Sequence, residues 1–194
     1  MKRTKHNLSH FRALSGDMGQ LLPIQCLEVL PGDTTRLSTD VLIRVSPLLA
    51  PVFHPVDARI HHFFVPNRLT WSGWEDFITG GSDGAGGSSG TYPTIDTGAG
   101  GGAAGGLLDY LGVPPGVANL DVCALPVRAY NAIWNEYYRD KDLATARSTD
   151  DVTLARCAWG KDQFTAARPW AQKGDAVTLP LGTSAPVSVA GLGS

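Results

Sequence analysis

The first third of the chain contains three runs of residues that favour β-strands, with no helix-forming run between them. The runs cover residues 21–30, 34–45 and 56–65. The first is rich in aliphatic side chains and ends at the turn Pro31-Gly32-Asp33, and the other two alternate with a period close to two. Three prolines within residues 46–55 predict a bend or a sheet edge. Strands joined by turns favour an antiparallel sandwich or barrel, so we expect a mainly β fold.

Helical spacing of apolar residues begins only after residue 66. Trp71, Trp74 and Ile78 predict a short amphipathic helix, and residues 107–111 predict another before Gly112. A clearer helix follows Pro126, where apolar and aromatic residues recur every three or four positions up to Tyr138. Residues 161–167 favour one further helical turn. An aromatic stripe of this kind indicates packing rather than a cofactor site.

Residues 80–106 form a glycine-rich insertion, in which 12 of 27 positions are glycine. Because glycine loses the most backbone entropy on folding, we expect this insertion to be a surface excursion without a single conformation. A phosphate-binding loop would require glycines at fixed offsets followed by Lys-Ser or Lys-Thr, and the insertion lacks that pattern.

The N-terminal residues 1–20 are predicted to form a basic arm, with no acidic residue before Asp17. Its cations are Lys2, Arg3, Lys5 and Arg12. An ordinary solvated terminus and an arm that contacts phosphates both fit this pattern, since Lys and Arg neutralise backbone charge without needing a fold. The net charge of the chain is −2, so any contact with nucleic acid must be local.

No group of residues predicts catalysis, a cofactor or a metal ion. His61 and His62 are adjacent and would point to opposite faces of a strand, which disfavours the His-x-His ligand pair of cupin-like enzymes. The three cysteines are far apart and odd in number, which argues against a disulfide framework or a zinc site. No apolar run is long enough to predict a membrane span. We therefore expect a protein that is not an enzyme and has no membrane partner.

Four segments, in the same order along the chain, resemble the major capsid protein of the Microviridae, in particular the gokushovirus-like group. The first, LLPIQCLEVLPGDT at residues 21–34, is similar to the line that opens the family's shell domain. HHFFVPNRLTWSGWEDF at 61–77 and LPVRAYNAIWNEYYRD at 125–140 resemble two further family segments. The fourth covers residues 161–177 and differs from the family in Ala171, where proline is common.

The resemblance implies a viral jelly-roll β-sandwich with long loop and helical insertions. Residues 21–194 would form the N-terminal portion of that domain, with the glycine-rich insertion at 80–106 and a helical insertion around 125–143. A jelly roll needs about eight strands, and family members are much longer, so we expect this chain to be an incomplete domain.

The resemblance also implies a virion protein that is assembled in the cytoplasm of a bacterial host. Its expected partners are copies of itself in an icosahedral shell, other virion proteins and the packaged circular single-stranded DNA. Lys2, Arg3, Lys5 and Arg12 are then candidates to face the DNA. Seven aromatic residues are candidates for packing or subunit interfaces: Trp71, Trp74, Phe77, Tyr130, Trp134, Tyr137 and Tyr138.

A second hypothesis is a β-domain that binds single-stranded nucleic acid without assembling. Such a domain should interleave aromatic and basic residues on one sheet face. Here the aromatic residues neighbour acids and asparagines instead, as in Trp74-Glu75-Asp76 and Trp134-Asn135-Glu136. The sequence therefore favours the shell protein.

Overall fold

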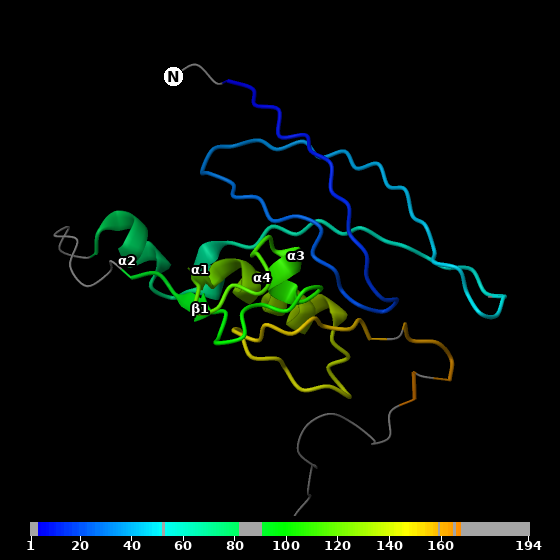
Figure 1. The fold of residues 1–194 in the computed structure, drawn as a ribbon. Helices are drawn as coiled ribbons and strands as arrows, with labels where there is room; N and C mark the ends of the chain where they lie inside the picture. The colour runs from blue at the N-terminus through cyan, green and yellow to red at the C-terminus, as the bar shows by residue number, and fades with distance from the viewer. Residues whose placement is uncertain (1–3, 52, 82–90, 159, 165, 168–194) are drawn as a thin grey trace, which may run out of the picture. The chain divides into compact units, whose positions relative to one another are not determined.

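The fold was analysed in a computed structural model, which describes residues 4–51, 53–81, 91–158, 160–164 and 166–167 (Figure 1). Residues 1–158 and residues 159–194 form separate units. In the second unit, the amide of Ala166 donates to the carbonyl of Asp162 over 2.9 Å, which agrees with the predicted helical turn. All elements described below belong to the first unit.

Two short helices follow the third predicted strand. Helix α1 covers Asn67–Thr70, which the sequence did not predict, and α2 covers Trp74–Thr79. The predicted helix starts three residues late because the amide of Trp74 donates to the carbonyl of Trp71 and closes a turn first. Helix α2 ends at Gly80, whose φ of 86° lies in the left-handed region that favours glycine.

Helices α3 and α4 supply the core. Helix α3 covers Leu107–Tyr110, and α4 covers Leu125–Ile133 and continues as the π-helix η1, Trp134–Tyr138. Both helices agree with the apolar spacing in the sequence. Leu107 and Val127 are fully buried between them, together with Leu108, Tyr130 and Ala155. Proline in the first turn of α4 fits there because that turn has no intrahelical partner for its amides.

A two-stranded antiparallel sheet lies beside this core. Strand β1, Thr94–Asp96, pairs with β2, Asp121–Cys123, so that Ile95 lies opposite Val122. Both of these central side chains pack against the core cluster, while their strand neighbours are exposed. Neither strand is predicted from the sequence, because three residues are too few to show a period of two.

The prediction that residues 80–106 adopt no single conformation is wrong for the second half of the insertion. Residues 94–96 form β1, and the loop after it is fixed by backbone hydrogen bonds such as Gly116 N–H to Gly102 C=O, 2.9 Å. Gly101 has a φ of 68° and lies against the backbone of Gly116. Glycine therefore permits a close approach here instead of promoting disorder. Residues 82–90 lie outside the described part of the chain.

The three predicted strands at 21–30, 34–45 and 56–65 are not strands in the described residues. Figure 1 shows them as extended segments that run from blue to cyan without strand arrows. The alternation of apolar and polar residues indicates which side chains are suited to a buried face. A strand forms, however, only where a second strand supplies hydrogen-bond partners. Little of the described chain is helical and its sheet is antiparallel, which agrees with the mainly β class without establishing a jelly roll.

Candidate interaction surfaces

The extended segment, residues 25–59, is exposed at every described position. It carries many large apolar side chains, and Leu42, Leu49 and Phe53 are at least 84% exposed. Soluble monomers rarely expose apolar side chains in such numbers on one stretch, and exposed apolar surface of this kind marks interaction sites. The extended segment is therefore the largest candidate interaction surface among the described residues.

Backbone pairing joins the residues just before this segment to the chain near residue 156. Gln20 and Arg156 form an antiparallel bridge, and the amides of Leu21 and Cys157 donate to Ala155 and Gly19 over 2.9 and 3.0 Å. The Tyr130 hydroxyl adds a second link, because it donates to the Leu21 carbonyl and accepts from the Ala155 amide. Burial raises the pKa of Tyr130, which keeps this hydroxyl protonated as a donor.

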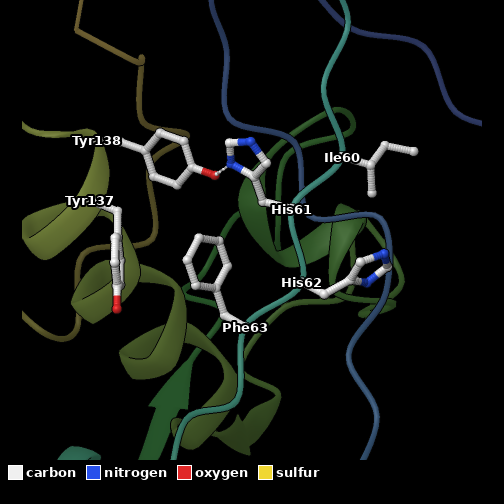
Figure 2. A pocket seen from close by; sticks show the side chains of 6 residues that line it. All are labelled: Ile60, His61, His62, Phe63, Tyr137 and Tyr138. Carbon is white, nitrogen blue, oxygen red and sulfur yellow. Dashed lines mark hydrogen bonds between the residues drawn. The ribbon is translucent and has the colours of Figure 1, made fainter. Parts of the chain in front are cut away.

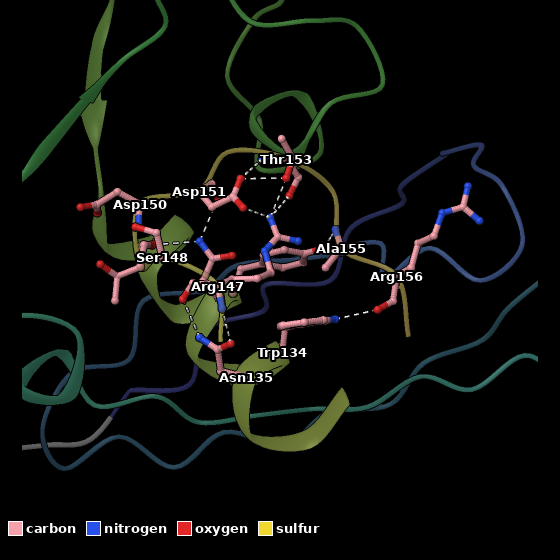
Figure 3. Close-up of polar contacts among 12 residues, drawn as sticks. Trp134, Asn135, Arg147, Ser148, Asp150, Asp151, Thr153, Ala155 and Arg156 are labelled. Atoms are coloured by element: carbon pink, nitrogen blue, oxygen red, sulfur yellow. Dashed lines mark hydrogen bonds and ion pairs between the residues drawn. The ribbon is translucent and has the colours of Figure 1, made fainter. Parts of the chain in front are cut away.

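A polar loop, residues 147–156, is held to α4 and η1 by side-chain hydrogen bonds (Figure 3). The fully buried Asn131 donates to the carbonyls of Thr149 and Asp151 over 2.9 and 2.8 Å. Asn135 exchanges two hydrogen bonds with the backbone of Arg147. These side-chain contacts take the place of the backbone hydrogen bonds of a strand or helix. The loop therefore has a fixed path although it has no regular secondary structure.

Arg147 is the central charge of this loop. Its guanidinium pairs with Asp151 at 3.0 Å, donates to Thr153 and lies 5.6 Å from the centre of the Trp134 ring. Burial alone would raise the pKa of Asp151, but hydrogen bonds from Thr153 and the charge of Arg147 hold it below its usual value. Arg128 forms a second ion pair, with Asp150 at 2.6 Å, and also donates to the carbonyl of Thr70 in α1.

Aromatic residues from distant parts of the sequence meet at an open pocket of about 550 Å³ (Figure 2). Phe63 packs on Tyr137 with ring centres 4.9 Å apart, and His61 stacks on Tyr138 and hydrogen-bonds to its hydroxyl. Ile60 and His62 complete the lining. The sequence does not predict this aromatic pocket, because nothing in the spacing relates residues 60–63 to residues 137–138.

The predicted aromatic interface residues separate into three groups. Trp71, Trp74 and Phe77 pack on one another, with ring centres 5.3–6.3 Å apart. Tyr130 is in the core, and Trp134 is partly buried with its indole donating to the carbonyl of Arg156. Tyr137 and Tyr138 line the aromatic pocket. Tyr137 is 67% exposed, so it has the most surface left for an interface.

The predicted DNA-facing cations differ in whether their charges are engaged in contacts within the chain. Lys2 and Arg3 lie outside the described residues, and Lys5 is exposed. The guanidinium of Arg12 donates to the backbone carbonyl of Tyr110, and the Tyr110 hydroxyl donates to the carbonyl of Ser15. Arg12 therefore attaches this part of the arm to α3, and its charge is partly engaged within the chain.

Neither a metal centre nor a membrane span is found in the part of the chain that the structure describes. No group of three His, Cys, Asp or Glu side chains there could hold an ion. The helices among those residues are all too short or too polar to cross a bilayer. Cys26, Cys123 and Cys157 are free thiols, and all three residues are exposed.

Comparison with known proteins identifies the family. A family model described as "Capsid protein (F protein)" matches residues 1–193. Over 96% of its length the chain is 38% identical to the capsid protein VP1 of Bdellovibrio phage phiMH2K, and over 99% it is 35% identical to that of Chlamydia phage 1. It is 28% identical to the capsid protein VP1 of Spiroplasma virus 4. The chain belongs to the F protein family of viral capsid proteins.

Family membership confirms the resemblance drawn from the four sequence segments, and it makes the chain a structural protein rather than an enzyme. The chain spans 37–38% of the length of these three relatives.

Proposed function

We propose that the chain is the N-terminal part of a shell subunit that self-assembles into a small icosahedral phage capsid around circular single-stranded DNA. The subunit would assemble in the cytoplasm of the bacterial host and contact copies of itself and other virion proteins. The observation that carries the proposal is the family match, which extends over nearly the whole chain. A shell function also agrees with the many exposed apolar side chains of the extended segment.

In this proposal, the three predicted strands pair within the complete subunit. Residues 21–30, 34–45 and 56–65 have the apolar content of strands that bury one face, yet most of them are exposed, and only residues 21–24, 60 and 65 are partly buried. Strand partners supplied by the remainder of a longer subunit would pair their backbones and cover those side chains, which would give the jelly-roll sandwich that the resemblance implies.

Electron microscopy tests the proposal directly. The complete reading frame that contains this chain and the 194-residue chain alone would be expressed and purified in parallel. We expect uniform closed shells from the complete frame, and no shells from the shorter chain because its strands lack partners. A well-folded monomer or dimer from both samples would overturn the proposal and favour the non-assembling nucleic-acid-binding domain.

The basic arm is proposed to contact the packaged DNA through Lys2, Arg3 and Lys5, with Arg12 in a secondary role. A variant with the first three replaced by Gln should form shells that contain less DNA, because counterion release from phosphates is lost. Arg12→Gln should reduce DNA content less, since its guanidinium is engaged with Tyr110. DNA content is measured from the ratio of absorbance at 260 and 280 nm. Unchanged content in the triple variant would exclude this role for the arm.

A further inference from the structure

The aromatic pocket is open and pre-formed on the surface. Its walls come from the end of the third predicted strand, residues 60–63, and from the end of the π-helix η1, Tyr137 and Tyr138. Figure 2 shows the rings of Phe63 and Tyr137 beside each other and inclined, with His61 pointing at the Tyr138 hydroxyl. The π-helical turn places two consecutive tyrosines against one segment, and such turns occur often at functional sites.

The chemistry of the aromatic pocket fits an uncharged, apolar occupant. No Lys, Arg, Asp or Glu is among its six lining residues. A single-stranded nucleic acid is bound by aromatic rings together with a cationic groove that follows the phosphates, and this lining lacks the cations. Aromatic residues without charges are instead typical of the centre of a protein–protein interface.

One stretch of the extended segment has matching chemistry. Residues 46–56, SPLLAPVFHPV, contain no Lys, Arg, Asp or Glu. Among their described residues, Leu49 is fully exposed and Phe53 is 88% exposed, so neither fills the pocket of its own chain. Residue 52 lies outside the described part of the chain.

Pairing with another strand is more restricted for this stretch than for residues 34–45. Pro47, Pro51 and Pro55 each lack an amide donor, and their spacing of four would place them along one edge of a strand, so a regular β-ladder cannot form on that edge. Docking against a surface would cover its apolar side chains without requiring a ladder on that edge. Proline-containing segments dock in this way into grooves lined by aromatic rings.

We propose that the aromatic pocket of one copy receives Phe53 and Leu49 from a second copy of the same chain. The contact is heterologous, because the donating and receiving surfaces differ, and contacts of this type close into rings when the rotation permits. The inference rests on the proposed shell function, which supplies neighbouring copies, and it assigns one of the contacts between them.

Photo-crosslinking in assembled shells tests which segment fills the pocket. The complete protein carries p-benzoylphenylalanine in place of Tyr137, and shells are assembled from a mixture of ¹⁴N-labelled and ¹⁵N-labelled protein. Trypsin cleaves after Arg44 and Arg59, so the proposed donor is released as the single peptide 45–59. We expect position 137 to crosslink to that peptide, with mixed-isotope products that identify two different copies.

The same experiment separates failure of the inference from failure of the proposed function. Crosslinks from position 137 to another peptide, to DNA, or to peptide 45–59 of the same isotope label only would overturn the inference while shells still form. Absence of shells from the unmodified complete protein would overturn the proposed function itself. The matched control places the crosslinker at Tyr92, an exposed tyrosine outside the pocket, which should not react with peptide 45–59.

Variants provide an independent test of the same contact. Phe53→Ala should raise the protein concentration needed for half-maximal assembly at least about tenfold, because the apolar surface of one ring is no longer buried at each contact. Phe11→Ala is the matched control, since Phe11 is 90% exposed and lies outside the proposed contact. Tyr137→Ala should have the same effect as Phe53→Ala, and the double variant should be less than additive. Additive effects would show that the two residues do not meet.

Discussion

Two regions of the first unit differ in how far their apolar side chains are buried. The helical body, residues 91–158, contains all the buried residues of the core and nearly all of the polar network around it. The extended segment, residues 25–59, has comparable apolar content but exposes every described residue. Helices satisfy their backbone within a few residues, whereas strands depend on partners far away in sequence. The difference teaches that the helical body stabilises itself, while the extended segment is built to be covered by something else.

Shortening an apolar side chain should change the free energy of unfolding far more in the helical body than in the extended segment. Leu107→Ala removes a fully buried side chain from the helical body and should lower the free energy of unfolding by about 3–5 kcal/mol. Leu42→Ala makes the same change at an exposed position of the extended segment and should shift it by less than about 0.5 kcal/mol. Urea unfolding of the 194-residue chain, followed by circular dichroism, measures both. Equal effects would show that the extended segment is buried in solution.

A glycine substitution tests whether the glycine-rich insertion belongs to the helical body. Gly101→Ala should destabilise the chain by about 2–3 kcal/mol, since alanine is strained at a φ of 68° and its Cβ would lie 2.5 Å from the Gly116 carbonyl carbon. Gly100→Ala is the control, because a Cβ there meets nothing within 4 Å. The same urea titration compares the two. A neutral Gly101→Ala would mean that this part of the insertion has no fixed conformation, as the sequence alone predicted.

The sequence predicted the elements whose evidence is local. The apolar spacing from Val127 to Tyr138 and the run at 107–111 specify helices, because residues three and four apart share a face within one element. The family segments were also local strings, and the family match confirms them. The alternation at 34–45 predicted a strand, which is absent from the described residues, because pairing is decided by residues that the pattern does not contain.

The candidate surfaces could not be predicted for the same reason. Tyr137 and Tyr138 were identified as aromatic candidates, but their partners His61 and Phe63 are more than 70 residues earlier in the sequence. Arg147 and Asp151 gave no signal at all, since a charged residue in a loop looks solvated until the fold places Trp134 and Asn135 beside it. Arg12 was chosen for its charge alone, and only the structure shows its bond to Tyr110.

Removing one hydroxyl tests the connection between the two regions. Tyr130→Phe leaves the Leu21 carbonyl and the Ala155 amide without their shared partner and should cost about 1–2 kcal/mol of stability. It should also speed tryptic cleavage at Arg36 and Arg44, because Leu21, just before the extended segment, is held less firmly. Tyr137→Phe is the matched control at an exposed tyrosine and should change neither quantity. Unchanged cleavage in Tyr130→Phe would show that backbone pairing near Gln20 is sufficient to hold the segment.

The smallest expected effect is a pH dependence that arises in the polar loop of the helical body. Hydrogen bonds from Thr153 and the charge of Arg147 outweigh burial and hold the pKa of Asp151 below its usual 3.8. The folded chain then binds fewer protons than the unfolded chain, so this stabilisation is complete above about pH 5 and is lost as the pH falls through the lowered pKa. Asp151→Asn should therefore be less stable than the wild type at pH 6, and the difference should shrink towards pH 3 in urea titrations.

Thr153→Val should weaken the same pH dependence, while Thr153→Ser, which retains the hydroxyl, should preserve it. If the stability difference between Asp151→Asn and the wild type were the same at pH 6 and pH 3, the charge of the Asp151 carboxylate would not stabilise the loop.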